Sequence, residues 1–277
     1  MDKQTKYKRS IQKHLYFAGE LSCADLSELI DKSVPLTSRV LNEMMEEGRV
    51  VELGYALSTG GRRPQMYALK ADLSYMVSVA MDQKITRIAL LDMRNNYVGK
   101  VKSIELALND NPDALQELTA HISDFISNSS VPREKIAGIG IGMPGFVNSD
   151  KGLNFSFLKV KEEESIVSVV ESVVGIPVLI DNDSSLIALA ELKLGAARKK
   201  QNVMVINISW GIGLGMIVNG ALFSGHDGFA GEFSHIPIFT NNKMCSCGKS
   251  GCLETETSLS IVVEKAIEGL KNGKLSI

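Results

Sequence analysis

Hydrophobic residues in the first part of the chain recur at the spacing of helices. Ile11 and Leu15 share one side of a helix that we expect to cover residues 10–17. A second helix is expected after Ser22, because Ser22 and Asp25 have the spacing of a capping box. The start of the chain therefore predicts a small helical domain.

A third helix is expected after Ser33, which can cap it, with Pro35 in the first turn where no amide hydrogen bond is lost. Gly48 suits the position after the last turn. The apolar residues of this helix recur at helical spacing, at Leu36, Val40, Leu41 and Met44.

The pattern then changes to two short apolar runs, residues 50–53 and 66–69, which predict a hairpin. The turn between them, residues 58–64, is rich in glycine and basic residues. Three helices followed by a hairpin with a basic tip is the plan of a winged helix-turn-helix, so we predict a DNA-binding domain over residues 1–70.

The candidate DNA contacts lie at the start of the third helix and at the hairpin tip. Early side chains of such a helix reach base edges in the major groove, and arginines on a glycine-rich tip can enter a narrow minor groove. A solvated charged turn is the alternative interpretation of the tip. The candidate residues are Ser33, Thr37, Ser38, Arg39, Arg62 and Arg63.

The remaining residues, 71–277, alternate between strand-like and helix-like patterns, which favours a mixed α/β sheet. Strands are expected at residues 75–80, 88–92, 136–142, 178–180, 203–208 and 215–218, and helices at 112–127 and 184–194.

Composition narrows the possibilities further. The 277 residues carry a net charge of −2, so any contact with nucleic acid must come from a local patch. The basic residues near the N-terminus are not followed by the apolar core of a signal peptide, and no apolar run is long enough to cross a bilayer. We therefore expect a cytosolic protein without a membrane partner.

The strongest chemical pattern combines one histidine with three clustered cysteines: His235, Cys245, Cys247 and Cys252. One imidazole and three thiolates complete a tetrahedral zinc site that leaves no position for water, which predicts structural zinc. In a reducing compartment a disulfide is a weaker explanation of such a cluster. A loop of free thiols with an unrelated histidine is the alternative.

Two further patterns carry candidate chemistry. Asp183 follows an apolar strand and begins a helix, where it can contact a sugar hydroxyl, remove its proton, or simply cap the helix. Glu232 lies between glycines close to His235. The glycines of residues 211–215 can cradle a phosphate through backbone amides or form a tight hairpin.

Taken together, these motifs resemble those of the ROK family, which unites repressors and sugar kinases on the actin-like ATPase fold. The motifs are Gly140 to Gly145, Asn182 with Asp183, Gly211 to Gly215, Gly231 to His235, and the cysteine run through Glu254. The N-terminal domain with its Gly-Arg-Arg-Pro tip is similar to the transcriptional regulators of this family, the NagC/XylR-like branch.

The resemblance implies roles by position. Asp183 corresponds to the catalytic base of the kinases and would be catalytic only in a kinase. The residues implied to bind the sugar are Asn182, Asp183, Glu232, His235 and Glu254, with Asn154 as a looser match.

The two nucleotide loops depart from the kinase pattern. The kinases carry Asp-x-Gly-Gly-Thr, whereas Lys84 and Ile85 occupy the glycine positions here, between Asp82 and Thr86. In the second loop Ser209 and Trp210 replace the Gly-Thr of Gly-Thr-Gly. A β-branched or bulky side chain cannot easily replace glycine beside a phosphate, so we expect neither ATP nor Mg²⁺ to bind.

The fold class expected is thus α/β, an N-terminal winged helix-turn-helix followed by an actin-like, sugar-kinase-like domain over residues 71–277. Family members continue beyond the position of Ile277, so the second lobe is expected to be truncated.

The function expected is a repressor that binds a double-stranded DNA operator as a homodimer or higher homo-oligomer. It would respond to a sugar or a sugar phosphate. One alternative is an ATP-dependent sugar kinase with an accessory DNA-binding domain. Another is a regulator controlled by a partner protein instead of a metabolite.

Overall fold

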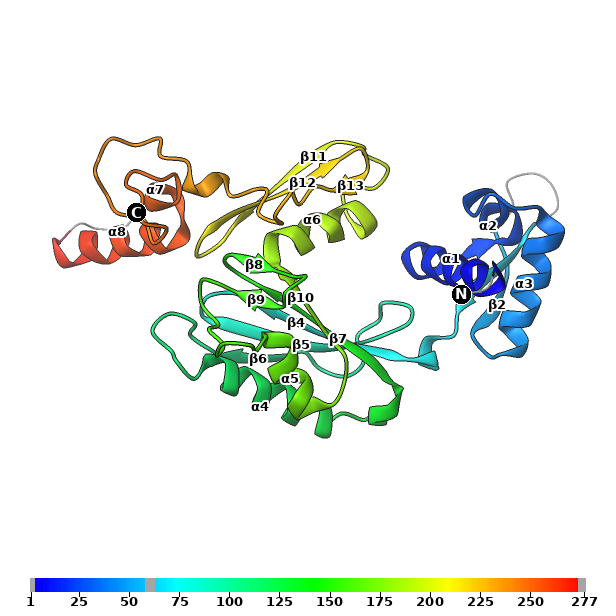
Figure 1. The fold of residues 1–277 in the computed structure, drawn as a ribbon. Helices are drawn as coiled ribbons and strands as arrows, with labels where there is room; N and C mark the ends of the chain where they lie inside the picture. The colour runs from blue at the N-terminus through cyan, green and yellow to red at the C-terminus, as the bar shows by residue number, and fades with distance from the viewer. Residues whose placement is uncertain (1–2, 58–62, 274–277) are drawn as a thin grey trace. The chain divides into compact units, whose positions relative to one another are not determined.

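The computed structural model describes residues 3–57 and 63–273 (Figure 1). Contacts divide the chain into two compact units. The first comprises residues 1–78, 88–102 and 125–139, and the second comprises residues 79–87, 103–124 and 140–277. In the described part of the chain, no helix combines the length and the apolar character needed to span a membrane.

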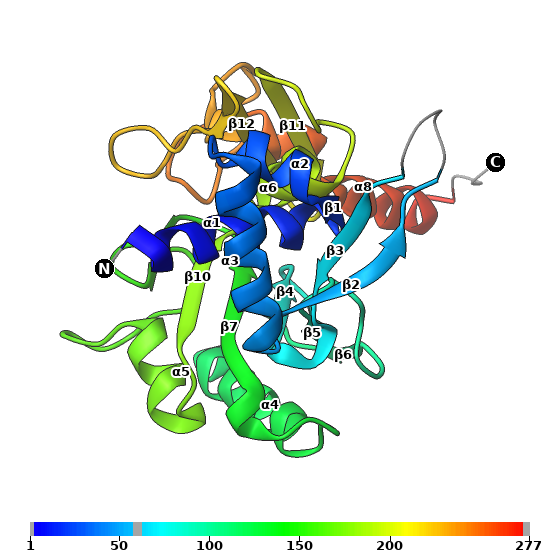
Figure 2. The same ribbon diagram turned by 90° about the vertical axis from the view of Figure 1, so that its right-hand side faces the viewer.

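The N-terminal segment of the first unit has three helices and a three-stranded antiparallel sheet of order β1-β3-β2 (Figure 2). The predicted capping box at the start of α2 is present, with Ser22 accepting a hydrogen bond from the amide of Asp25. Thr37, Val40, Leu41 and Met44 are the buried residues of α3. The elements are α1 Lys3–Ala18, β1 Leu21–Ser22, α2 Cys23–Leu29, α3 Val34–Glu46, β2 Val50–Tyr55 and β3 Gln65–Leu69.

Side chains from these helices and strands enclose one hydrophobic core. Ile11 and Leu15 of α1, Leu26 of α2 and Met44 of α3 are at most 1 % exposed. Met93, which follows a strand later in the same unit, packs into this core. In addition, the side-chain amide of Asn95 donates a hydrogen bond of 3.1 Å to the carbonyl of Tyr16. The N-terminal segment is thus anchored to the turn at residues 92–96.

A five-stranded sheet has the order β10-β7-β4-β5-β6 and confirms the α/β class. Strand β7 is almost continuously apolar and buried, as expected for a strand covered on both faces. Helix α5 packs against β10. The elements are β4 Tyr75–Met81, β5 Ile85–Asp92, β6 Lys102–Glu105, α4 Ala114–Ser127, β7 Ile136–Met143, α5 Ile166–Val174 and β10 Val178–Asn182.

The second unit also contains a hairpin, β8 Val147–Asn148 with β9 Leu153–Asn154, and an antiparallel sheet of order β11-β12-β13. Helix α6, Asp183–Leu194, lies against this three-stranded sheet (Figure 1). The strands are β11 Val203–Ile208, β12 Ile212–Val218 and β13 Ala221–Leu222, followed by a 3-10 turn at Phe233–His235 and by helices α7 Glu254–Thr257 and α8 Leu259–Lys271.

The glycines of β12 serve close packing. A Cβ atom on Gly213 would lie 1.9 Å from the hydroxyl of Ser184, and one on Gly215 would lie 2.3 Å from the Cβ of Ala188. Strands β11 and β12 form a tight hairpin, with Ile208 paired to Ile212. Of the two interpretations of this glycine cluster, the structure therefore supports the hairpin.

Candidate functional site

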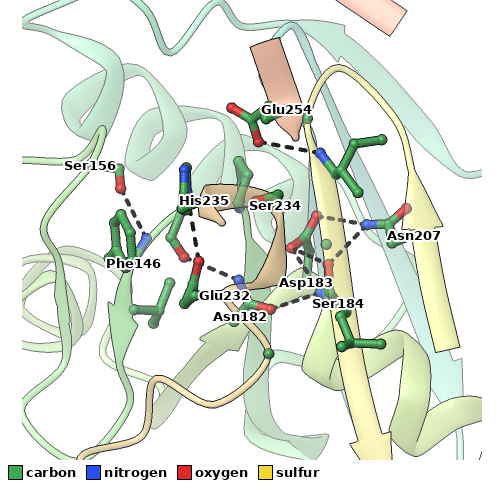
Figure 3. Close-up of a pocket in the computed structure, with 18 of the residues that line it drawn as sticks. Phe146, Ser156, Asn182, Asp183, Ser184, Asn207, Glu232, Ser234, His235 and Glu254 are labelled. Carbon is green, nitrogen blue, oxygen red and sulfur yellow. Dashed lines mark hydrogen bonds and ion pairs between the residues drawn. The ribbon is translucent and has the colours of Figure 1, made fainter. Parts of the chain in front are cut away.

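A cavity of about 360 Å³ lies within the second unit (Figure 3). Its walls come chiefly from the β4–β5 turn, the segments on either side of the β8–β9 hairpin, the start of α6 and the β11–β12 turn. The loop before the 3-10 turn, the cysteine loop and the start of α7 complete them. All five residues that the resemblance implied for sugar binding line it, namely Asn182, Asp183, Glu232, His235 and Glu254. Pockets of this size commonly bind small molecules.

Asn182 has a structural role in this site. Its side-chain oxygen accepts hydrogen bonds from the amides of Ser184 and Ser185, which caps α6, and its nitrogen donates to the carbonyl of Gly145. Helix capping, the plainer alternative for this motif, is thus what Asn182 does. It also fixes the loop at Gly145 against the start of the helix.

Asp183 is held by neighbours and points into the cavity (Figure 3). One carboxylate oxygen accepts from the amide of Ser184 at 2.7 Å, and the other accepts from the side-chain amide of Asn207 at 3.2 Å. Burial raises the pKa of Asp183 above its usual value. A carboxylate in this position can accept a hydrogen bond from a hydroxyl group or take its proton.

Asn207 is a site residue that we did not identify from the sequence. It lies on β11, where Val203 and Val205 face inward and their neighbours face outward. A polar residue on the inward face of an otherwise apolar strand was the available signal. Besides Asp183, its amide contacts the hydroxyl of Ser184 at 3.1 Å.

Glu232, His235 and Glu254 complete the polar part of the cavity. The Nε2 atom of His235 lies 3.8 Å from a carboxylate oxygen of Glu232. Burial, followed by the charges of Glu254 and Asp183, raises the pKa of Glu232 to about 7. Three carboxyl groups that converge in this way favour a ligand that can donate several hydrogen bonds.

The predicted metal ligands come together. The ligand atoms of His235, Cys245, Cys247 and Cys252 all lie within 4.8 Å of one another. The Sγ atoms of Cys247 and Cys252 are 3.7 Å apart, and the Nδ1 atom of His235 is 3.4 Å from the Sγ of Cys245. Zinc–sulfur bonds of about 2.3 Å place the corners of a tetrahedron about 3.8 Å apart, so the cluster can hold a metal ion.

His235 therefore connects the two sites: its Nδ1 atom faces the thiolates and its Nε2 atom faces Glu232. Gly251 allows the cysteine loop to close, because its φ is +74° and a Cβ atom there would lie 1.9 Å from the carbonyl oxygen of Phe239.

The two altered nucleotide loops meet each other. The ammonium group of Lys84 lies 3.7 Å from the centroid of the Trp210 ring, a cation–π contact. The carboxylate of Asp82 accepts hydrogen bonds from the amides of Lys84 and Ile85, at 2.7 and 2.8 Å. The amides at the two glycine positions of the kinase pattern thus already donate hydrogen bonds to Asp82, and the side chain of Lys84 contacts Trp210 of the other loop.

Thr86 and Asn154, two further positions that match the family pattern, do not line the cavity. The hydroxyl of Thr86 is buried and has no hydrogen-bond partner in the described part of the chain. Asn154, the loosely matched sugar contact, donates to the carbonyl of Pro144 and accepts from the amides of Ser156 and Phe157. Its side chain therefore fixes its own loop.

The structure corrects one candidate DNA contact. Thr37 is completely buried, and its hydroxyl donates to the carbonyl of Ser33, so it belongs to the helix core. Ser33 lies at the N-cap position of α3 without a capping hydrogen bond from its side chain. Arg39 and Arg63 are exposed and Ser38 is half-buried. Arg62 lies outside the described residues.

Comparison with known proteins identifies the family and agrees with the fold. The sequence profile of the ROK family matches residues 77–274. The xylose repressor of Caldicellulosiruptor bescii is 32% identical over 256 residues, which cover 90% of this chain and 63% of that protein. The DNA-binding transcriptional repressor Mlc of Escherichia coli is 28% identical and covers 90% of this chain and 62% of its own.

Among solved structures, a ROK family transcriptional regulator homologous to the E. coli Mlc protein aligns with a TM-score of 0.72 and 24% identity, covering 99% of this chain and 69% of its own. A ROK family glucokinase from Streptomyces griseus aligns with a TM-score of 0.61 and 23% identity, covering 72% and 62%. These two structures show the fold. The chain spans a little over three-fifths of the length of the repressors that it matches.

Proposed function

Because the chain belongs to the ROK family, we propose that it is a sugar-responsive, DNA-binding transcriptional repressor and not a sugar kinase. Residues 1–70 form its winged helix-turn-helix, and residues 71–277 form its sensor. The extent of the alignments supports this division. The regulator structure aligns over 99% of the chain, whereas the glucokinase structure leaves more than a quarter of it unmatched.

The contact between Lys84 and Trp210 carries the argument against phosphoryl transfer. Phosphoryl transfer depends on loops whose backbone and cations surround the phosphates. Here Lys84 and Trp210 contact each other, and Asp82 occupies the backbone amides of that turn. ATP and Mg²⁺ therefore have no role in this proposal.

The cavity is the binding site for the sugar or sugar derivative. Asp183, Glu232 and Glu254 accept hydrogen bonds from its hydroxyl groups, and His235 supports Glu232. Asn182 and Asn207 act as positioning residues, because each fixes the start of α6. Sugar binding alone explains why an aspartate occupies position 183, where the ROK kinases have their catalytic base.

The metal site holds structural zinc through His235, Cys245, Cys247 and Cys252. With four protein ligands, the ion has no open position for chemistry. It fixes the orientation of the imidazole whose other nitrogen faces Glu232.

DNA binding uses the exposed start of α3 and the hairpin between β2 and β3. Ser38 and Arg39 lie where side chains reach the major groove, while Arg62 and Arg63 enter the minor groove. A homodimer in the cytosol binds an inverted repeat, and the sugar shifts the population toward a state that fits the operator less well.

The decisive experiment selects bound duplexes from a random DNA pool and repeats the selection with a panel of sugars that includes xylose, glucose and N-acetylglucosamine. We expect an A·T-rich inverted repeat that is lost in the presence of one of the sugars. If no duplex is enriched even at low salt, the proposal is wrong.

The variant Arg63→Ala tests the role of the hairpin. We expect a lower affinity for the selected duplex and a salt dependence reduced by about one counterion, because one phosphate or minor-groove cation is removed. Lys100→Ala, another exposed basic residue of the same unit, is the matched control and should leave both quantities unchanged. Unchanged binding by Arg63→Ala would remove the hairpin from the interface.

A sugar kinase remains the second candidate, because Asp183 points into the cavity as the catalytic base of the ROK kinases would. Coupled detection of ADP with the same sugars tests it. If the wild-type protein turns over a sugar and Asp183→Asn does not, the protein is a sugar kinase and the proposal of a non-enzymatic regulator is wrong.

A further inference from the structure

Three phenylalanine rings form a continuous row along one wall of the cavity. Phe146 immediately precedes β8 and Phe155 immediately follows β9, and the amide of Phe155 donates a hydrogen bond of 2.9 Å to the carbonyl of Phe146. Phe229 comes from the loop that precedes Glu232. All three line the same cavity as Asp183.

The row begins at the polar site and ends at solvent. Phe146 is stacked on the imidazole of His235, with ring centroids 5.4 Å apart (Figure 3). Phe229 contacts Phe146 edge-to-face at 6.2 Å and Phe155 at 6.3 Å. Exposure is 37% for Phe229 and 55% for Phe155. The inner ring, Phe146, is half-buried, while the outer rings are more exposed.

The increase in exposure along the row divides the cavity into a polar inner part and an aromatic outer part. The inner part offers carboxylates and suits the hydroxyl groups of one sugar ring. The outer part offers phenyl rings, whose faces carry partial negative charge and attract the slightly positive C–H groups of a ring laid on them. Single exposed aromatic residues are common on protein surfaces, but a row of three, in which the middle ring contacts both others on the wall of a cavity, indicates a binding surface.

We propose that the effector carries a second ring, and that Phe155 and Phe229 form the subsite for it. The first ring is a sugar held by the polar part of the cavity. The second ring is attached to it through a glycosidic bond and lies on the outer phenyl rings. Either a second pyranose or an aryl group supplies the required C–H-rich or apolar face. This inference rests on the sugar-binding function proposed above.

The test compares ligands that differ only in the second ring. Calorimetric titration of the full chain would use xylose, xylobiose and phenyl β-xyloside, and the corresponding series of glucose, cellobiose, maltose and phenyl β-glucoside. Methyl glycosides separate the effect of the ring from that of blocking one hydroxyl. We expect at least one two-ring ligand to bind about three- to tenfold more tightly than its monosaccharide, the range of a single aromatic contact.

Variants of Phe155 then locate the second ring. Phe155→Ala should lower the affinity for the two-ring ligand by about three- to tenfold and leave the affinity for the monosaccharide unchanged. Phe155→Tyr, which keeps an aromatic ring, should bind the two-ring ligand as tightly as the wild type. Phe223→Ala is the matched control, because Phe223 is 47% exposed and does not line the cavity.

The possible outcomes distinguish failure of the second-ring subsite from failure of the proposed sugar-binding function. The subsite is wrong, and the sugar-binding function stands, if monosaccharides bind as tightly as every two-ring ligand. The same conclusion follows if Phe155→Ala weakens the monosaccharide equally. Both fail if no ligand of either series binds.

Discussion

Asp183 meets two opposing physical demands. In the proposed function it accepts hydrogen bonds from a sugar, yet burial of its carboxylate raises its pKa and makes the charged form unfavourable in the folded protein. A group whose pKa is raised on folding contributes its stability at low pH and loses it as the pH rises through the raised value. At neutral pH we therefore expect the wild-type protein to be less stable than a variant with the neutral isostere at this position.

We predict that Asp183→Asn raises Tm at neutral pH by about 2–4 °C, the effect of about 1 kcal/mol in a protein of this size. The gain should diminish as the pH is lowered and the carboxyl group of the wild type becomes protonated. Sugar affinity should fall about 10- to 100-fold, because hydrogen bonds to a charged group are lost. Calorimetric scans at several pH values and a sugar titration measure these effects.

The control is Asp150→Asn, which changes an exposed carboxylate of the same unit and should alter neither Tm nor affinity. A lower Tm for Asp183→Asn at neutral pH would mean that hydrogen bonds from Ser184 and Asn207 outweigh the effect of burial.

Residues were predictable where a short stretch of sequence defines the chemistry. The cysteine run and His235 identify a metal site from spacing alone, and the structure brings them together. The contact between Lys84 and Trp210 was not predictable in this way, since 126 positions separate the two in the chain and only the fold brings them together. Thr37 was misassigned because its side of α3 faces the core, a difference of about 100° from its neighbour Ser38.

At the scale of elements, the loop between His235 and Cys252 has few other means of holding its shape. Its regular structure is limited to isolated bridges, Met244 with Ser250 and Pro237 with Cys252. Metal binding should therefore supply much of its stability, as in small zinc-binding modules.

We predict that the purified protein contains one zinc ion per chain and that Cys247→Ser loses it. Sugar affinity should fall in that variant, because the imidazole of His235 is no longer fixed beside Glu232. Outer contacts of this kind change metal affinity or activity about 10- to 100-fold. Elemental analysis and a sugar titration measure both quantities.

Cys23→Ser is the appropriate control, because Cys23 lies on α2 of the other unit and takes no part in the cluster. Full sugar affinity in a zinc-free Cys247→Ser protein would show that the metal does not position the histidine.

The order of elements was largely predictable, whereas their functional pairing was not. Hydrophobic periodicity located α3 and α6, whereas the glycines of residues 211–215 allowed either a phosphate cradle or the hairpin that the structure has. Periodicity could not show that β12 approaches α6 so closely that only glycine fits at positions 213 and 215. That requirement arises from the packing of two elements and leaves no local signature.

At the scale of the molecule, the outward face of β11 is strongly apolar. Met204, Ile206 and Ile208 are 73, 57 and 65% exposed, and β11 is an edge strand of its sheet. In the same unit, α8 exposes Val262, Ile267 and Leu270. Exposed apolar residues that share one face of a strand commonly mark an interaction site, and the open edge of β11 adds to this tendency.

We predict that this face contributes to the homodimer that an inverted repeat requires. Ile206→Lys places a charge in the contact and should lower the mass measured by light scattering after size exclusion. Affinity for the full inverted repeat should then approach that for one half-site, because the second half-site no longer benefits from linkage. Leu179→Lys, on β10 and 75% exposed, is the matched control. An unchanged mass for Ile206→Lys would place the dimer contact elsewhere, and loss of sugar binding in the same variant would indicate misfolding instead.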